Sequence, residues 1–282
     1  MRLLNRNVPP HTASASRLQA VIFDWAGTTV DFGSLAPTRT LQKVFEAFGI
    51  QLYESEARRD MGLAKRDHIA RILSMERVQA AWKLAHSTPP LEADLDRVYE
   101  SFVPLQFNCL GKYSSVIEGV PEAVERARSR GLRIGSTTGY TRAMLDLLVT
   151  QSAREGFTPD VSLSPEDVGA GRPGPFMIFE NAVRLQVYPL ASIVKVGDTV
   201  ADIQEGLNAG VWSIGVVKSG NLIGLTKADL DALPEQDLAG RVRTARTELE
   251  HAGAHYVIDT MDELEGVLDD IGIQLGSAAL RK

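Results

Sequence analysis

Short, continuously apolar segments alternate along the chain with longer segments in which apolar residues recur at helical spacing. The first apolar run extends from Ala20 to Phe23, is followed by Asp24 and is broken by Gly27. A run of this kind predicts a strand buried on both faces, as in a parallel sheet. The alternation predicts an α/β fold with a doubly wound (Rossmann-like) parallel sheet core, whose sites lie at the carboxyl ends of the strands. Similar apolar runs recur at 132–135, 193–196, 211–217 and 255–258, and helix-compatible segments lie between or after them at 121–130, 141–153, 175–185, 202–209 and 261–271.

One long segment, from Thr40 to Lys112, breaks this alternation. It is rich in Ala, Glu, Arg and Leu, its apolar residues recur at helical spacing, and it contains no convincing strand. We therefore expect an all-helical cap domain inserted after the first strand. The expected boundaries are 18–36 and 116–282 for the core and 37–115 for the cap, with hinges near 32–37 and 113–119 where the cap closes over the core.

Composition narrows the classes of function. Of the 282 residues, 44% are hydrophobic and 23% charged, and the net charge of −6 offers no general attraction to nucleic acid or to anionic lipid. The single cysteine, Cys109, has no partner for an internal disulfide. No apolar run approaches the roughly 18–20 residues that span a bilayer. We therefore expect a cytoplasmic protein that acts on a small molecule and binds neither nucleic acid nor membrane.

The first 17 residues contain three arginines and no acid, a composition compatible with a targeting peptide. They lack an apolar stretch followed by a cleavage pattern, and their Pro, Ser and Asn content favours a flexible N-terminal tail.

Acids, hydroxyls and a cation follow the predicted strands. Asp24 ends the first strand, and residues 136–140 (Ser-Thr-Thr-Gly-Tyr) supply hydroxyls and amides after the second. Arg172 lies in a tight glycine-containing loop, and Asp198 and Asp202 are one helical turn apart after a later strand. An isolated acid at a strand end is as often a cap for the following turn. Together, however, these groups predict a site for magnesium and phosphate.

In this order the four clusters resemble the motifs of the haloacid dehalogenase-like superfamily of phosphotransferases. The resemblance implies that Asp24 is a nucleophile that forms an aspartyl-phosphate, and that Thr138, Gly139 and Arg172 hold the phosphoryl oxygens. A carboxylate that attacks a dianionic phosphoryl group needs its repulsion neutralised, and a metal ion together with Arg172 supplies the positive charge.

The same resemblance implies a Mg²⁺ site and also shows a departure. Asp24 and Asp198 would ligate the ion, the backbone carbonyl of Ala26 would remain available to it, and Asp202 would act through water or orient Asp198. Most phosphatases of the superfamily have an aspartate two residues after the nucleophile, where this chain has Ala26. That aspartate protonates an oxygen leaving group. The alanine therefore means either lost activity or a leaving group that needs no proton from that side.

The predicted cap contains a residue that fits the second interpretation, in which the leaving group needs no proton from Ala26. Its segment Met61-Gly-Leu-Ala-Lys65-Arg-Asp-His68, together with residues 24–31, 135–141 and 196–199, resembles the phosphonatase family, the phosphonoacetaldehyde hydrolases. A lone lysine on a helical insert is usually a solvated charge. Here the resemblance implies that Lys65 forms an imine with an aldehyde. The imine would accept the electron pair of a breaking carbon–phosphorus bond, for which a carbanion is a poor leaving group.

The resemblance also implies a substrate, a pathway and an oligomeric state. The substrate would be phosphonoacetaldehyde, cleaved to acetaldehyde and phosphate in 2-aminoethylphosphonate degradation, and the protein would be a homodimer through its cap. Lys65 must be neutral to attack, so its pKa must be lowered, by burial or by cations such as Arg66, His68 or the metal. His68 is a candidate to assist proton transfers, and Met61 and Tyr140 would line the pocket, although each is also explained as an ordinary cap or packing residue.

Two alternatives remain open at this point. One is a Mg²⁺-dependent phosphomonoesterase or phosphomutase of the same superfamily, against which Ala26 argues. The other is a non-catalytic phosphate-binding module, against which the retention of Asp24, Thr138, Arg172 and Asp198 argues.

Overall fold

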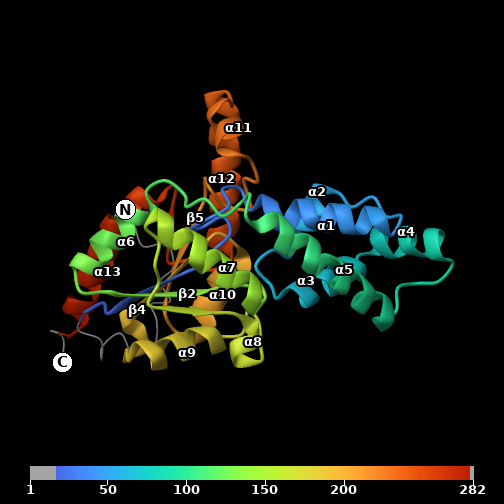
Figure 1. Cartoon of the computed structure of the whole chain (residues 1–282). Coiled ribbons are helices and arrows are strands. Elements are labelled where there is room, and N and C mark those ends of the chain that lie inside the picture. Colours follow the sequence, from blue (N-terminus) through green and yellow to red (C-terminus); the bar gives the residue numbers. More distant parts are fainter. Residues whose placement is uncertain (1–16, 280–282) are drawn as a thin grey trace.

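A computed structural model of the protein describes residues 17–279, and its centre is a six-stranded, wholly parallel sheet (Figure 1). The strand order is β3-β2-β1-β4-β5-β6, so β1 lies in the middle of the sheet. The parallel sheet and its crossover helices confirm the expected doubly wound core. The strands are β1 (Ala20–Phe23), β2 (Arg133–Thr137), β3 (Val161–Leu163), β4 (Ile193–Gly197), β5 (Trp212–Val216) and β6 (Tyr256–Ile258).

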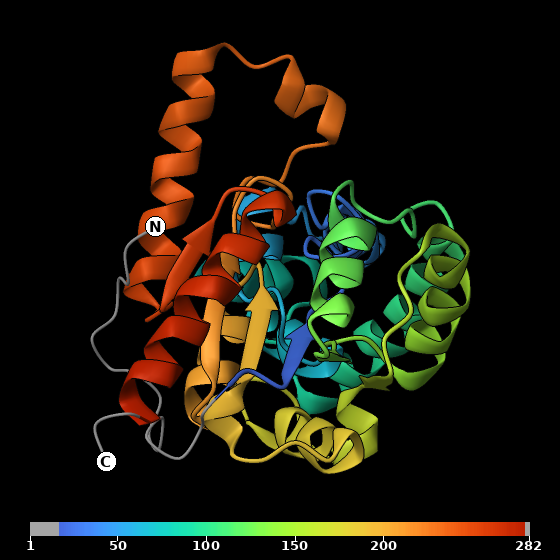
Figure 2. The same cartoon turned by 90° about the vertical axis from the view of Figure 1, so that its left-hand side faces the viewer.

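Helices cover both faces of the sheet, and the alternation of side chains along β1 shows which helices face which side. Val21 and Phe23 belong to one apolar cluster with residues of α6, α7 and α13, whereas Ala20 and Ile22 pack with residues of α9. Figure 2 shows these layers from the side. The core helices are α6 (Val120–Ser129), α7 (Arg142–Ser152), α8 (Pro165–Val168), α9 (Phe176–Leu185), α10 (Val200–Ala209), α11 (Lys227–Asp231), α12 (Glu235–His251) and α13 (Leu264–Ala279).

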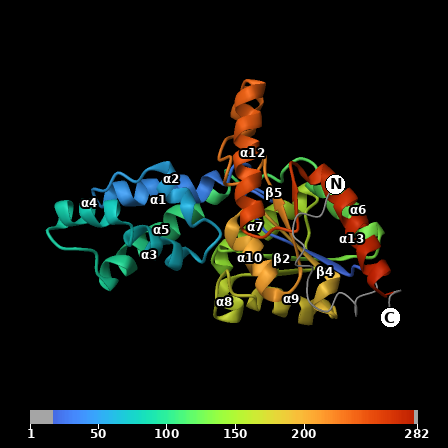
Figure 3. The ribbon, with the colours of Figure 1, turned by 180° about the vertical axis from the view of Figure 1, so that it is seen from behind.

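Five helices without any strand form the cap, which lies beside the carboxyl ends of the strands (Figures 1 and 3). Its own core is apolar and contains the fully buried Trp82, which stacks on Phe48 with ring centroids 5.6 Å apart. The long α5 packs on both α1 and α3 and holds the cap together. The cap helices are α1 (Leu35–Ala47), α2 (Glu54–Arg59), α3 (Lys65–Leu73), α4 (Glu76–His86) and α5 (Glu92–Leu110).

Three features differ from the sequence expectation or lie beyond it. The edge strand β3 escaped prediction because it has only three residues and a polar one, Ser162, at its centre. Helix α1 begins at Leu35, inside the segment 32–37 that we expected to be a hinge. The predicted N-terminal tail lies outside the described residues except for Arg17. Within residues 17–279, no helix is both long and apolar enough to cross a membrane.

Candidate active site

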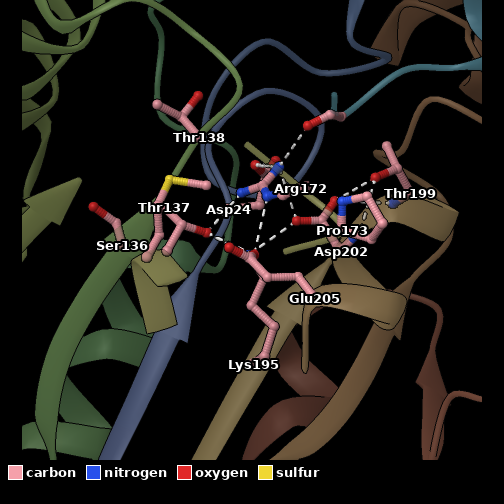
Figure 4. A network of polar contacts seen from close by, with 12 residues as sticks. Asp24, Ser136, Thr137, Thr138, Arg172, Pro173, Lys195, Thr199, Asp202 and Glu205 are labelled. Carbon is pink, nitrogen blue, oxygen red and sulfur yellow. Dashed lines mark hydrogen bonds and ion pairs between the residues drawn. The ribbon is translucent and has the colours of Figure 1, made fainter. Parts of the chain in front are cut away.

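Arg172 is the centre of the polar network at the carboxyl ends of the strands (Figure 4). Its guanidinium Nη1 lies 2.7 Å from Asp24 Oδ1 and 3.0 Å from Asp202 Oδ1, and its Nε lies 3.0 Å from Glu205 Oε2. The guanidinium is almost fully buried. Burial lowers its pKa, but the carboxylates of Asp202, Asp24 and Glu205 outweigh this effect and raise the pKa above its ordinary value. Arg172 is therefore a fixed cation directly beside the proposed nucleophile.

A second layer of buried polar groups lies beneath Arg172. Lys195 on β4 lies 2.9 Å from Asp202 Oδ1 and 3.4 Å from Glu205 Oε2, and it donates to Thr137 Oγ1 at 2.9 Å. Thr137 also accepts a hydrogen bond from Arg172 (2.7 Å) and donates one to Glu205 (3.0 Å). The sequence carries no signal for Glu205, and it groups Thr137 with the hydroxyls of residues 136–140 expected at the phosphate site, whereas the structure places Thr137 beneath Arg172. Because Asp202 Oδ1 and Glu205 Oε2, which contact the Arg172 guanidinium, are themselves contacted by Lys195, the network fixes the orientation of Arg172.

Three buried carboxylates form a candidate metal centre. Ligand oxygens of Asp24, Asp198 and Asp202 all lie within 4.8 Å of one another. Asp198 is oriented by hydrogen bonds from the Thr28 hydroxyl (3.0 Å) and the Asn221 backbone N–H (2.7 Å). A Cβ atom on Gly27 would come within 2.3 Å of Asp198 Oδ2, so only glycine permits this approach.

The charge balance of this centre fits a divalent cation. Four buried carboxylates (Asp24, Asp198, Asp202 and Glu205) face three buried basic groups (Arg172, Lys195 and Lys65), which leaves a formal excess of one negative charge when Lys65 is protonated and of two when it is neutral. Burial, and then the neighbouring carboxylates, raise the pKa of Asp198 well above its ordinary value. Burial and the charge of Asp202 also raise the pKa of Asp24, although Arg172 opposes the rise. Carboxylate oxygens are the ligands that hard divalent cations prefer, and such an ion would relieve this repulsion.

Asp202 differs from the other two acids because protein groups already occupy both of its oxygens. Oδ1 pairs with Arg172 and Lys195, and Oδ2 accepts a hydrogen bond from the Thr199 hydroxyl at 2.5 Å. Burial would raise its pKa, but the two cations outweigh this and hold the pKa below its usual value. Asp202 is thus a permanent anion at the first turn of α10, placed to orient its neighbours.

The proposed phosphate-binding residues Thr138 and Gly139 lie at the end of β2, beside the same cavity as Asp24 and Arg172. The Thr138 hydroxyl accepts a hydrogen bond from the Tyr140 N–H at 3.1 Å, which orients its oxygen across the turn. Thr138 is 2% exposed, so a group bound there is shielded from bulk water.

Lys65 is the first residue of cap helix α3, and it lines this cavity from the cap side. It is 6% exposed, and its ammonium lies 4.8 Å from the centre of the Tyr140 ring, a cation–π contact. Burial lowers the pKa of Lys65 to about 8; the charge of Asp24 opposes this shift and that of Arg172 adds to it. The pKa is therefore lowered by desolvation and by Arg172, not by Arg66, which is partly exposed and ion-paired with Glu92 and Asp96.

His68 and Met61 complete the part of the cap that faces the site. His68 is fully buried one turn after Lys65 and lies near the Ala57 backbone, and among the described residues neither ring nitrogen has a hydrogen-bond partner of good geometry. Burial and then the charge of Lys65 lower its pKa to about 3, so the imidazole is neutral and adds no positive charge that could shift Lys65. Met61 is 5% exposed and lines the cavity, as does Tyr140.

The cap is closed on the core, and three glycines allow the close approach. Cβ atoms would come within 2.4 Å of Thr199 Oγ1 if added to Gly62, and within 2.3 Å of the Leu63 carbonyl oxygen if added to Gly139. A Cβ atom on Gly171 would likewise meet Ala64 at 2.8 Å. The cavity between the cap and the core measures about 20 Å³, whereas one water needs roughly 10–15 Å³ on the same scale. A phosphonate does not fit, so ligand entry requires the cap to open.

This closure gives a first testable expectation. Gly139→Ala adds a methyl group that collides with the Leu63 backbone, and the φ of Gly139 is not in the left-handed region, so the variant is expected to fold. We expect kcat/KM to fall about 100-fold, as a misplacement of about 1 Å can cause, with little change in the unfolding temperature. Gly240→Ala, on the open surface of α12, is the matched control. An unaltered kcat/KM in Gly139→Ala would show that this closed contact is not needed for turnover.

Known proteins resemble the chain closely. The haloacid dehalogenase-like hydrolase family matches residues 18–210. A phosphonoacetaldehyde hydrolase from Nitratidesulfovibrio vulgaris is 43% identical over 258 residues, which is 92% of each protein. One from Bacillus cereus (strain G9842) is 42% identical over 255 residues, covering 90% of this chain and 97% of that protein. The crystal structure of a phosphonoacetaldehyde hydrolase-like protein from Oleispira antarctica superposes with a TM-score of 0.91 at 37% identity, covering 93% of this chain and 95% of that one.

Proposed function

The chain belongs to the haloacid dehalogenase-like hydrolases and, within them, to the phosphonoacetaldehyde hydrolases, and on this premise we propose that it cleaves phosphonoacetaldehyde to acetaldehyde and phosphate. One observation carries the proposal: Lys65, from the cap, and Asp24, from the core, line the same small cavity, where Ala26 stands in place of a general acid. An amine nucleophile and a carboxylate nucleophile at one cavity suit a substrate with two electrophilic centres, an aldehyde carbon and a phosphorus atom.

The first half of the proposed reaction takes place on Lys65. Its neutral amine adds to the aldehyde carbon, and a proton moves from the nitrogen to the oxygen of the resulting carbinolamine. Uptake of one proton from solvent then lets water leave and forms a protonated imine. With a pKa of about 8, about one molecule in ten carries the neutral amine at pH 7, against about one in 2,500 for an unshifted lysine. The pKa of about 3 keeps His68 neutral but makes it a weak base, so we assign it the relay of a proton from the amine nitrogen to the carbinolamine oxygen and not the role of a final proton acceptor. Met61 and the Tyr140 ring exclude water from this part of the cavity.

The second half takes place on Asp24. Its carboxylate attacks phosphorus while the electron pair of the carbon–phosphorus bond moves into the imine, which becomes an enamine. Protonation of the enamine carbon and hydrolysis of the imine release acetaldehyde, and water hydrolyses the aspartyl-phosphate to phosphate. Thr138, the Gly139 amide and Arg172 hold the phosphoryl oxygens in this proposal. Mg²⁺, held by Asp24, Asp198 and the Ala26 carbonyl and supported by Asp202, would supply positive charge against the repulsion between carboxylate and phosphonate.

The proposal predicts the pH dependence of the reaction. Since only the neutral amine attacks and burial has lowered its pKa to about 8, kcat/KM should rise about tenfold per pH unit below pH 8 and level off above it. The measurement is kcat/KM from pH 6 to 9.5 in a constant-ionic-strength buffer, with the rate of imine trapping followed in parallel. A profile that is flat across pH 7–9 in both measurements would contradict the assigned role of Lys65.

Measuring acetaldehyde released from phosphonoacetaldehyde, with and without Mg²⁺, tests the function directly. We expect equal amounts of acetaldehyde and phosphate with Mg²⁺ and neither after chelation. Release of phosphate from sugar phosphates, with no acetaldehyde formed from phosphonoacetaldehyde, would instead indicate a phosphomonoesterase.

We also propose a cytoplasmic homodimer that acts in 2-aminoethylphosphonate degradation. A mass of one chain by light scattering would contradict the dimer.

A further inference from the structure

Arg58, the penultimate residue of cap helix α2, reaches across to the core. Its Nη1 donates to the Gly33 carbonyl at 2.9 Å and to the Asn221 side-chain oxygen at 3.1 Å, and its Nη2 donates to the Gly224 carbonyl at 3.0 Å. Asn221 returns the contact, because its Nδ2 donates to the Arg58 carbonyl at 3.0 Å. Glu54, one turn earlier on α2, orients the guanidinium at 2.7 Å. A planar guanidinium can bond several acceptors at once, which an ammonium cannot do with the same geometry.

The core loop that Arg58 contacts, residues 219–225, also contacts the candidate metal centre. Asn221 donates its backbone N–H to Asp198 Oδ2 at 2.7 Å, and Gly220 lies so close that an added Cβ would meet the Asp198 Cβ at 2.8 Å. The Ser219 hydroxyl donates to the Gly27 carbonyl at 2.7 Å, in the turn that follows Asp24. Loop 219–225 therefore contacts the turns that carry both Asp24 and Asp198.

Within the cap, Arg58 directly precedes the segment that carries Lys65. The chain runs from Arg58 through Met61 and Gly62, which line the cavity, to Lys65 at the start of α3. Fixing the end of α2 against loop 219–225 thus fixes the start of this segment. The bonds of Arg58 to the core go to backbone and amide oxygens, not to a buried carboxylate, so they can break and re-form as the cap opens and closes.

We propose that Arg58 and Asn221 form a latch that assembles the two halves of the site in one event: the same contact that brings Lys65 over the cavity fixes the loop whose backbone N–H orients Asp198. Both are positioning residues, and neither touches the substrate. The inference rests on the proposed function only for the role of Lys65. By thermodynamic reciprocity, an ion that binds at Asp198 must favour the latched state as much as the latch favours the ion.

The first experiment compares Arg58→Ala with Arg59→Ala, its exposed neighbour on α2, as the control. We expect Arg58→Ala to slow borohydride trapping of the Lys65 imine by phosphonoacetaldehyde 10- to 100-fold and to lower kcat more than it raises KM, while Arg59→Ala behaves as wild type. Arg58→Lys should recover only part of the loss. Asn221→Ala, which keeps the backbone N–H to Asp198, should lose as much as Arg58→Ala, and the double variant should lose no more than either. Wild-type trapping in Arg58→Ala, or additive losses in the double variant, would overturn the latch.

The second experiment needs no substrate. Hydrogen exchange of the full chain is measured with Mg²⁺ alone, over peptides that cover 32–37 and 219–225. We expect Mg²⁺ to slow exchange in wild type and in Arg59→Ala but not in Arg58→Ala or Asn221→Ala, and the affinity for Mg²⁺ by calorimetry to fall severalfold in the latter two. An equal response in all four proteins would refute the coupling. If wild type forms no imine adduct, the proposed function fails, and this experiment still decides on the latch. Should Arg58→Ala not fold, Arg58→Lys and Asn221→Ala carry both tests.

Discussion

Lys65→Arg is expected to abolish turnover of phosphonoacetaldehyde, by roughly 10⁴-fold or more in kcat/KM, which is the scale on which loss of a covalent nucleophile acts in other enzymes. The substitution keeps a positive charge at the cavity but removes the primary amine, and a guanidinium neither loses its proton near neutral pH nor forms an imine. Borohydride added with the substrate should leave a mass adduct on Lys65 in wild type and none in the variant.

The unfolding temperature separates this loss from simple misfolding. Because burial lowers the pKa of Lys65, its charged form is already disfavoured in the closed site, and a permanently charged arginine should lower the unfolding temperature modestly. Lys83→Arg, on the exposed face of α4, is the matched control and should change neither property. A Lys65→Arg protein that turns over like wild type would rule out the imine mechanism.

Asp24→Asn is expected to lower kcat to a similar degree, again on the order of 10⁴-fold, because an amide cannot take the phosphoryl group. The imine, however, forms before phosphorus is attacked. Borohydride should therefore still trap an adduct on Lys65 in Asp24→Asn, although no acetaldehyde is released. The two variants thus stop the reaction at different steps, and an Asp24→Asn protein that released acetaldehyde at the wild-type rate would exclude Asp24 as the nucleophile.

Stability adds an independent expectation for Asp24→Asn. The pKa of Asp24 is raised in the folded protein, so its ionised form costs folding free energy at every pH above its unfolded-state value, and this cost shrinks as the pH falls through the folded-state pKa. At pH 7 without divalent metal, the neutral asparagine should leave the unfolding temperature unchanged or raise it, and the difference from wild type should shrink in acid. Asp237→Asn, at an exposed position of α12, serves as the control. A marked loss of stability at pH 7 would mean that the Arg172 contact outweighs the burial of the charge.

Most of the core could be predicted from the pattern of apolar residues, because the apolar runs coincide with strands of the parallel sheet. Five of the six strands appeared as apolar runs, and Asp24, Thr138 and Asp198 follow strands whose carboxyl ends meet at one edge of the sheet. Strand β3 had no such signal, because three residues at a sheet edge need not alternate or be wholly apolar. Within the site, nothing in the sequence pointed to Glu205 or to its contact with Thr137, because the two residues are 68 positions apart and meet only through the packing of α10 against the sheet.

The sequence by itself determined the order of the motifs and the kinds of group available: a carboxylate after the first strand, an alanine where an acid would serve an oxygen leaving group, and a lysine in the insert. Only the tertiary structure decided that Lys65 and Asp24 share a cavity, that Arg172 is clamped by three carboxylates, and that Arg58 joins the cap to the loop behind Asp198. The reason is physical. Residue types and spacings are local properties of the chain, whereas desolvation, which lowers the pKa of Lys65, and hydrogen bonds between distant residues exist only once the cap has packed against the core.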